Sequence, residues 1–251
     1  TRARHLQRNP FYMRGSSVAR LAGGLSRQMG SSSAAQEAYL DADNCIVVDE
    51  KDRIVGGATK REAHHRNTMR LHRAFSVFAF TPDRQLIMQK RAATKVTFPS
   101  LWTNTCCSHP LTGMPRDETD GVGGVLRAAT RKLDHELNLA GVTEEQLLFM
   151  GRYLYKAAPP ELEWVEHELD YALVLRGIDR ARVARPNDDE VEQVRCVTER
   201  ELAALIKEEP ASFTPWMRHF VQIGVLSRWW SVIDDDKALQ KMTSDDIVKM
   251  N

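Results

Sequence analysis

Two glutamates, Glu166 and Glu168, lie two positions apart in the segment EHELDY at residues 166–171. Side chains two positions apart on a strand point to the same face, so both carboxylates would face one point and His167 the other side. Two such carboxylates repel each other unless a cation lies between them or one keeps a proton. The pair therefore indicates a metal or acid–base site, although a solvated edge strand would carry the same spacing.

Four of the eight histidines fall within residues 64–109, namely His64, His65, His72 and His109. Neutral imidazoles together with carboxylates suit a site for Mn²⁺, Zn²⁺ or Mg²⁺. The spacing contains no local metal motif such as HExxH, so histidines in surface loops remain the alternative interpretation.

Three cations, Lys60, Arg91 and Lys95, lie close in sequence to these histidines. Guanidinium and ammonium groups near a metal site suit an anionic substrate such as a diphosphate. Taken singly, each of the three would be ordinary surface charge.

Residues 103–110 read TNTCCSHP and lie between Trp102 and a proline. Small polar residues make poor core and poor helix, so we expect a rigid polar loop that presents a thiol. A buried structural cysteine is the commonest fate of a lone cysteine. A cysteine beside a histidine in such a loop is nevertheless a candidate acid, base or nucleophile.

The elements that position these residues are predicted from periodicity and turn signals. We expect a hairpin over residues 45–55, a second hairpin over 74–90, a helix over 122–139 and two strands around 149–155 and 168–175. Thr198 and Glu201 form a capping box before a helix over 202–207. Thr214 and Pro215 predict the start of a helix that continues through Trp230.

These elements predict an α+β fold, with helices packed on a mostly antiparallel mixed sheet, as one domain over residues 38–251. Residues 1–37 differ: six arginines and a serine-rich composition precede the first acidic residue, Glu37. This composition is typical of an organelle transit peptide, and a disordered basic tail is the alternative. We expect a plastid location, with mitochondrion and cytoplasm as alternatives.

Composition excludes some functional classes. The chain has 251 residues, is 42% apolar and carries a net charge of +1, which gives no reason to expect nucleic acid as partner. No apolar run reaches the roughly 18 residues of a membrane helix. The four cysteines have no CxxC pair, so we expect free thiols. We also expect a monomer.

Four motifs, in the same order, resemble type I isopentenyl-diphosphate isomerases of the Nudix superfamily. They are LHRAFS at 71–76, TNTCCSHP at 103–110, EHELDY at 166–171 and TPW at 214–216. The resemblance runs from about residue 38 to the end and implies a Nudix-like fold with added C-terminal helices. Residues 131–139 resemble a degenerate Nudix helix, in which Lys132, His135 and Asn138 depart from the hydrolase pattern. These departures favour an isomerase.

The resemblance implies that Cys107 is the catalytic thiol and Glu168 its acid–base counterpart, with Tyr155 alongside. Trp216 is implied as the aromatic wall over the hydrocarbon. On protonation, an unactivated double bond becomes a tertiary carbocation, so one group must supply a proton and another must remove one from the far face. Acid–base help of this kind contributes about 10² to 10⁴-fold.

The resemblance also implies two metal ions and a set of diphosphate contacts. One divalent ion, Mg²⁺ or else Mn²⁺ or Zn²⁺, would be bound by His64, His72, His109, Glu166 and Glu168. A second Mg²⁺, arriving with the diphosphate, would bind Glu136. The diphosphate contacts would be Lys60, Arg91, Lys95, Ser108 and Lys132. His65 remains an alternative to His64.

Two other functions remain open at this point. A Nudix diphosphatase would attack with water and tolerate loss of Cys107. A metal-stabilised binding module would bind the ligand without turnover.

Overall fold

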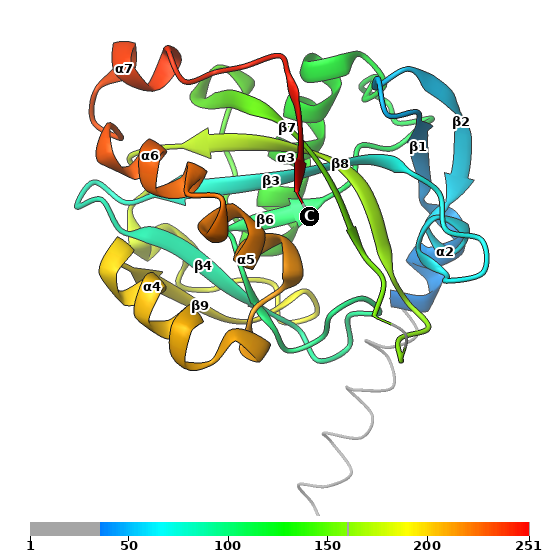
Figure 1. Cartoon of the computed structure of the whole chain (residues 1–251), viewed down its shortest axis with the longest axis horizontal. Helices are drawn as coiled ribbons and strands as arrows, with labels where there is room; N and C mark the ends of the chain where they lie inside the picture. Colours follow the sequence, from blue (N-terminus) through cyan, green and yellow to red (C-terminus); the bar gives the residue numbers. More distant parts are fainter. Residues whose placement is uncertain (1–35, 160, 251) are drawn as a thin grey trace, which may run out of the picture.

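A mixed sheet forms the centre of the computed structural model, which describes residues 36–159 and 161–250 (Figure 1). Within these residues ten strands form the sheet, and its main path runs β10-β7-β8-β3-β1-β2. The strands are β1 (Asn44–Val48), β2 (Ile54–Thr59), β3 (His72–Phe80), β4 (Leu86–Arg91), β5 (Trp102–Thr103), β6 (Cys106–Ser108), β7 (Leu147–Ala157), β8 (Glu166–Leu175), β9 (Val191–Val197) and β10 (Ile247–Met250). β3 pairs parallel with β8 and β10 parallel with β7, while the other pairs are antiparallel. The predicted α+β class and mostly antiparallel sheet are confirmed.

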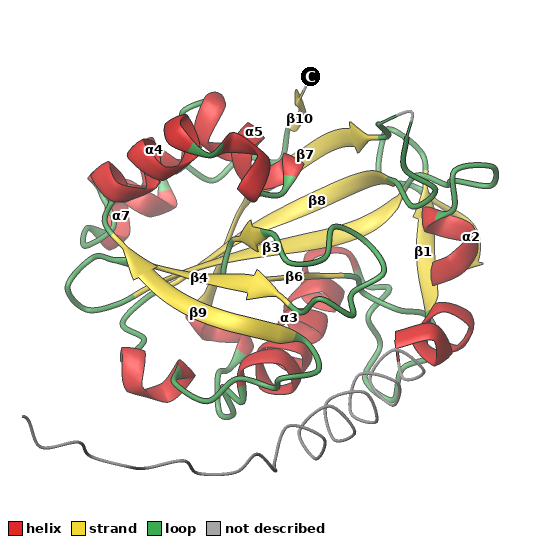
Figure 2. Cartoon of the chain, turned by 90° about the horizontal axis from the view of Figure 1, so that it is seen from below, coloured by secondary structure: helices red, strands yellow, loops and turns green. Residues whose placement is uncertain are grey.

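Helices cover both faces of this sheet. The α-helices are α2 (Lys60–His64), α3 (Gly121–Leu137), α4 (Glu199–Glu208), α5 (Pro215–Gln222), α6 (Val225–Ser231) and α7 (Asp236–Gln240), and residues 36–42 are also helical. Short 3₁₀ turns occupy Glu144–Gln146, Arg180–Val183 and Pro210–Ser212. Figure 2 shows the sheet between α3 on one side and α4 and α5 on the other.

The two faces of β3 build two separate cores, because side chains alternate along a strand. Phe78 and Phe80 pack into a cluster with Trp229 of the C-terminal helices. Phe75 and Val77 pack into a second cluster with residues of α3. Every residue of β3 is buried, so the strand is the axis on which both layers assemble.

The prediction of one continuous C-terminal helix from Pro215 through Trp230 is wrong. Gly224 adopts a left-handed φ of 69° and separates α5 from α6. Glycine takes this conformation without steric cost, and the break lets Phe220 and Trp229 both reach the same core. Thr214 precedes the helix as predicted, but its side chain makes no capping bond. The capping box of Thr198 and Glu201 is confirmed.

A fork in the sheet positions the segment 102–108. β3 and β4 form the predicted hairpin, but they pair only beside its turn, through Ala79 and Phe80, and then separate. β5 pairs with β4 on one side of the gap, and β6 pairs with β3 on the other. The side-chain oxygen of Thr105 accepts from the backbone N–H of Ala79 and donates to the carbonyl of Ile87. The predicted polar loop is therefore held rigidly inside the sheet.

Most of the tail predicted for residues 1–37 lies outside the described residues, so its boundary and its targeting role stay predictions. Among the helices of residues 36–159 and 161–250, none has both the length and the apolar character needed to cross a bilayer.

Candidate metal and acid–base site

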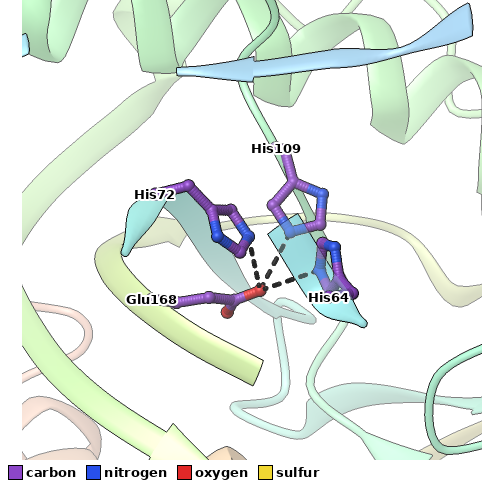
Figure 3. Close-up of side chains that lie close together, drawn as sticks. All are labelled: His64, His72, His109 and Glu168. Carbon is purple, nitrogen blue, oxygen red and sulfur yellow. Dashed lines mark hydrogen bonds and ion pairs between the residues drawn. The ribbon is translucent and has the colours of Figure 1, made fainter. Parts of the chain in front are cut away.

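Three histidines converge on one carboxylate oxygen near the N-terminal ends of β3 and β8 (Figure 3). His64 ends α2, His72 begins β3, His109 follows β6, and Glu168 lies on β8 directly beside His72 in the parallel register. The Oε1 atom of Glu168 lies 2.9 Å from Nε2 of His109, 3.5 Å from Nε2 of His72 and 3.7 Å from Nε2 of His64. The four ligand atoms lie within 4.8 Å of one another, and all four residues are buried.

The hydrogen bonds behind the histidines aim unprotonated nitrogens at the centre of this cluster. Nδ1 of His64 lies 2.8 Å from the carbonyl of Lys60, and Nδ1 of His72 lies 2.8 Å from the carbonyl of Arg70. A carbonyl only accepts, so Nδ1 carries a proton in both rings, and in a neutral ring Nε2 is then the nitrogen that presents a lone pair. Such backbone bonds behind histidine are typical of metal ligands.

The charge states complete a donor set that fits a divalent cation. Burial lowers the pKa of His64 to about 4 and holds the pKa of His109 well below its usual value, so both rings are neutral near pH 7. Burial alone would raise the pKa of Glu168, but the three imidazoles around its carboxylate outweigh burial and hold that pKa well below its usual value. Nε2 of His72 is buried and has no hydrogen-bond partner among the described residues. Lone pairs that face one another in this way are stable around a cation.

The same geometry decides which of His64 and His65 belongs to the cluster. Its Nε2 lies 3.4 Å from Glu163 near the surface, and it takes no part in the convergent cluster. The imidazole in the cluster is that of His64.

Tyr155 lies between the two glutamates of the EHE segment. Its hydroxyl oxygen is 2.5 Å from Oε2 of Glu166 and 2.6 Å from Oε2 of Glu168. A hydroxyl has one proton, so it donates to one carboxylate and needs a proton from the other. Burial and then the nearby charge of Glu168 raise the pKa of Glu166 well above its usual value, so the additional proton lies on Glu166. Both glutamates point to one face of β8, as the spacing predicted.

Cys107 lines the same pocket as this carboxylate pair. The pocket is bounded by Cys107 on β6, Tyr155 on β7, the two glutamates on β8 and Trp216 on α5. The sulfur lies 3.5 Å from Nη1 of Arg91. Burial raises the pKa of Cys107 to about 12, although Arg91 opposes that shift, so the group is a thiol near neutral pH. A thiol and an ionised carboxylate that line one pocket can act as a pair, the thiol supplying one proton and the carboxylate accepting one.

The cations that the sequence singled out line this pocket or the one beside it. Lys60, Arg91, Lys95 and Ser108 line the pocket itself, and Lys132 lines an adjoining one that shares Lys60 and Lys95. Arg91 is held by the carbonyl oxygens of Thr97 and Phe98 and lies 5.7 Å above the ring of Trp216. Guanidinium and ammonium groups gathered in this way suit an anion.

Glu190 is a site residue that sequence reasoning missed. It is 2% exposed, forms an ion pair with Lys95 and lies 3.8 Å from Nζ of Lys132. Burial opposes its ionisation, but the two lysines outweigh burial and lower the pKa of Glu190. In the sequence it follows Asn187-Asp188-Asp189, which reads as an exposed acidic turn, so no local signal marks it as buried.

Glu136 lies apart from the histidine cluster, on α3. Its Oε2 accepts from Nε2 of Gln89 at 3.1 Å and lies 3.5 Å from the sulfur of Cys106, while Oε1 is 3.2 Å from Nζ of Lys132. It lines neither pocket that contains the lysines. A metal role for Glu136 stays a prediction, as does one for Glu166, which lies outside the four converging side chains.

Comparison with known proteins gives a consistent family. The NUDIX domain matches residues 70–220. "Isopentenyl-diphosphate Delta-isomerase II, chloroplastic" of Arabidopsis thaliana is 40% identical over 229 residues, covering 86% of this chain and 78% of that protein. "Isopentenyl-diphosphate Delta-isomerase I, chloroplastic" of the same plant is 42% identical, covering 80% and 71%. An isopentenyl-diphosphate delta-isomerase of Gibberella zeae is 40% identical, covering 78% and 80%. A NUDIX hydrolase structure from Alicyclobacillus acidocaldarius matches with a TM-score of 0.46 at 11% identity, covering 69% and 97%.

Proposed function

The chain belongs to the Nudix superfamily and, within it, to the isopentenyl-diphosphate Delta-isomerases, and we propose that it uses Cys107 and Glu168 to interconvert isopentenyl diphosphate and dimethylallyl diphosphate. The observation that supports this most is that both groups line one pocket from different strands, β6 and β8. Neighbours within one loop could not flank a substrate in this way.

The proton balance explains why two groups are needed. A proton adds to the terminal carbon of the double bond, and the resulting tertiary cation loses a proton from the adjacent methylene group on the other side. One group therefore loses a proton and its counterpart gains one, and the roles exchange in the reverse reaction. The Cys107 thiol holds a proton on one side, and the Glu166–Tyr155–Glu168 set shares protons on the other. Such transfers contribute about 10² to 10⁴-fold.

Trp216 serves the cation in this proposal. Its ring lines the same pocket as the thiol and the carboxylates, 6.2 Å from the ring of Tyr155, and the residue is 2% exposed. The negative face of an indole attracts a cation, with an effect of about 2 kcal/mol when the pair is desolvated. Burial also keeps out water, which would otherwise capture the cation as an alcohol.

We assign a divalent cation to His64, His72, His109 and Glu168, with Glu166 as the further predicted ligand. When bound, such an ion would supply positive charge that holds the Glu168 carboxylate in place and accepts the lone pairs of the surrounding imidazoles. Mg²⁺ is our proposed ion, with Mn²⁺ and Zn²⁺ as alternatives. Glu136, beside Lys132, is the proposed ligand of a Mg²⁺ that accompanies the diphosphate.

The diphosphate is assigned to the cationic end of the pocket. Its proposed contacts are Lys60, Arg91, Lys95, Ser108 and Lys132. Burial works against the charge of Lys132, but Glu136 and Glu190 outweigh it and raise the pKa of that lysine. The Lys132 ammonium therefore keeps its charge for an anion, whereas burial lowers the pKa of Lys60.

The enzyme is a plastid protein in this proposal. The two Arabidopsis relatives are named chloroplastic, and residues 1–36 have the arginine-rich, serine-rich and acid-free composition of a transit peptide.

The test is proton NMR of isopentenyl diphosphate incubated with protein and Mg²⁺ in deuterated water. We expect deuterium in a dimethylallyl product, no product with Cys107→Ala, and normal product with Cys196→Ala, a matched control on β9. Release of phosphate in place of the isomer would indicate a diphosphatase. Binding without turnover would indicate a binding module.

A further inference from the structure

Asn104 is a fully buried residue in the bend between β5 and β6, three positions before the thiol. Its side-chain amide uses all four of its hydrogen-bonding positions. Oδ1 accepts from Nε1 of Trp216 at 2.9 Å and from the hydroxyl of Thr103 at 2.8 Å. Nδ2 donates to the carbonyl of Val77 at 3.1 Å and to the carbonyl of Cys106 at 2.8 Å. One side chain thus joins β3, the strand that carries the thiol, and the helix that carries the indole.

The partners of Asn104 require an amide. The indole N–H can only donate, so an acceptor must face Trp216. The carbonyls of Val77 and Cys106 can only accept, so two donors must face the other way. A carboxylate has no donors, and an aliphatic side chain has neither. Asparagine satisfies both sides within the available space, and no other side chain of its size does.

A second set of bonds extends this connection to the start of α5. The hydroxyl of Thr214 donates to the hydroxyl of Thr103 at 3.0 Å, and the backbone N–H of Thr214 donates to the carbonyl of Trp102 at 2.9 Å. The single proton of Thr103 is already donated to Asn104. In the 3.9 Å contact between Thr103 and the sulfur of Cys107, the thiol is therefore the donor. Asn104 in this way sets the direction of the Thr103 hydroxyl that the thiol faces.

We infer that Asn104 is a positioning residue that fixes the Trp216 ring and the Cys107 thiol relative to each other across the pocket. The inference rests on the proposed function, in which these two groups serve the cation and the proton. The side-chain amide of Asn104 bonds Thr103, Val77, Cys106 and Trp216 and none of the lysines proposed for the diphosphate, so it acts through the thiol segment and the indole. It should therefore affect turnover and cation recognition more than diphosphate binding.

The test compares Asn104→Asp with Trp216→Phe and with Asn67→Asp on the surface. Aspartate keeps the size and an acceptor for Trp216, but it lacks the two donors that hold this acceptor in place, and the carbonyls of Val77 and Cys106 repel its charge, so the acceptor shifts away from the indole N–H. For each variant we would measure kcat and KM with isopentenyl diphosphate. We would also measure affinity for two inhibitors, a diphosphate with a tertiary ammonium at the position of the cation and its neutral carbon analogue. The ratio of these two affinities reports cation recognition, which a loss of stability alone does not change.

We expect Asn104→Asp to lower kcat at least tenfold with KM changed less than about threefold, and to lower the ammonium preference about tenfold, as loss of a desolvated cation–π contact predicts. In the Trp216→Phe background the further loss should be clearly smaller, because the two residues act through one bond. Asn67→Asp should match the wild type.

The inference is overturned if folded Asn104→Asp keeps both kcat and the ammonium preference. If Asn104→Asp does not fold, Thr103→Val, which cuts the same chain of bonds, takes its place, with the same two readouts deciding. The Cys107→Ala variant distinguishes a failure of the proposed function from a failure of the role inferred for Asn104. An active Cys107→Ala variant contradicts the proposed function, whereas an inactive one beside a normal Asn104→Asp contradicts this inference alone.

Discussion

Replacing Tyr155 with phenylalanine removes one oxygen atom from between the two carboxylates. That oxygen lies 2.5 Å from Glu166 and 2.6 Å from Glu168, so both glutamates lose a short hydrogen bond. Hydrogen bonds to charged groups contribute about 1.5 to 3 kcal/mol each, and a buried acceptor left without a partner costs a similar amount. The ring, its packing and the three histidine contacts of Glu168 all remain.

We expect kcat to fall about 10²-fold, within the range of acid–base catalysis, because the carboxylate side can no longer share its protons. KM should stay within about threefold of the wild-type value, since the hydroxyl bonds the two glutamates and not the lysines proposed for the diphosphate. A loss of roughly 2 kcal/mol should lower Tm by about 4 to 8 °C in a chain of this size.

The assay is conversion of isopentenyl diphosphate followed by NMR, together with thermal unfolding. Tyr153→Phe is the matched control, because Tyr153 is buried on the same strand and face and lies outside the pocket. Wild-type kcat in folded Tyr155→Phe would show that the hydroxyl has no part in proton transfer and refute the reasoning.

Three further outcomes follow from the same site. Glu190→Gln should raise KM about tenfold with kcat nearly unchanged, because Lys95 and Lys132 lose the partner that orients them. Glu192→Gln, on the surface, is the control. An unchanged KM in Glu190→Gln would contradict the assignment of these lysines to the diphosphate. Burial lowers the pKa of His64 from 6.5 in the unfolded chain to about 4 in the folded protein. Between pH 6.5 and pH 4 the unfolded chain therefore binds more protons than the folded one, so the metal-free protein should lose stability as pH falls from about 6.5 to about 4. In His64→Asn the Tm should fall less steeply with pH over that range, and a fall as steep as in the wild type would contradict the role given to His64. Removal of divalent ions by a chelator should abolish turnover and lower Tm, and restoration by one added ion (Mg²⁺, Mn²⁺ or Zn²⁺) identifies the metal; full activity in chelator would exclude the metal role.

Much of the fold was predictable because its signals are local. Alternation along β3 and β8, the turn at residues 81–84 and the Thr198 capping box each depend on residues a few positions apart. The same holds for the Glu166 and Glu168 pair, since the period of two along a strand places both on one face. The resemblance of four short motifs added the family, and the comparisons confirm it.

Other features depend on packing between distant segments and leave no local pattern. Glu190 is buried among lysines because the fold brings it to residues distant in sequence, such as Lys95, nearly a hundred positions earlier. The choice of His64 over its neighbour follows from how α2 docks beside β8. Gly224 breaks a segment with helical spacing, because two aromatic side chains must reach one core.

The amino-acid order fixed which groups were available for chemistry and which faces of their strands they occupy, because those properties depend on neighbours along the chain. Which groups meet was set by folding. Asn104 and Trp216 are 112 positions apart and still share a hydrogen bond, because the fork between β3 and β4 and the docking of α5 bring them together. Periodicity acts over a few residues, whereas a site is built from contacts that only the packed core defines.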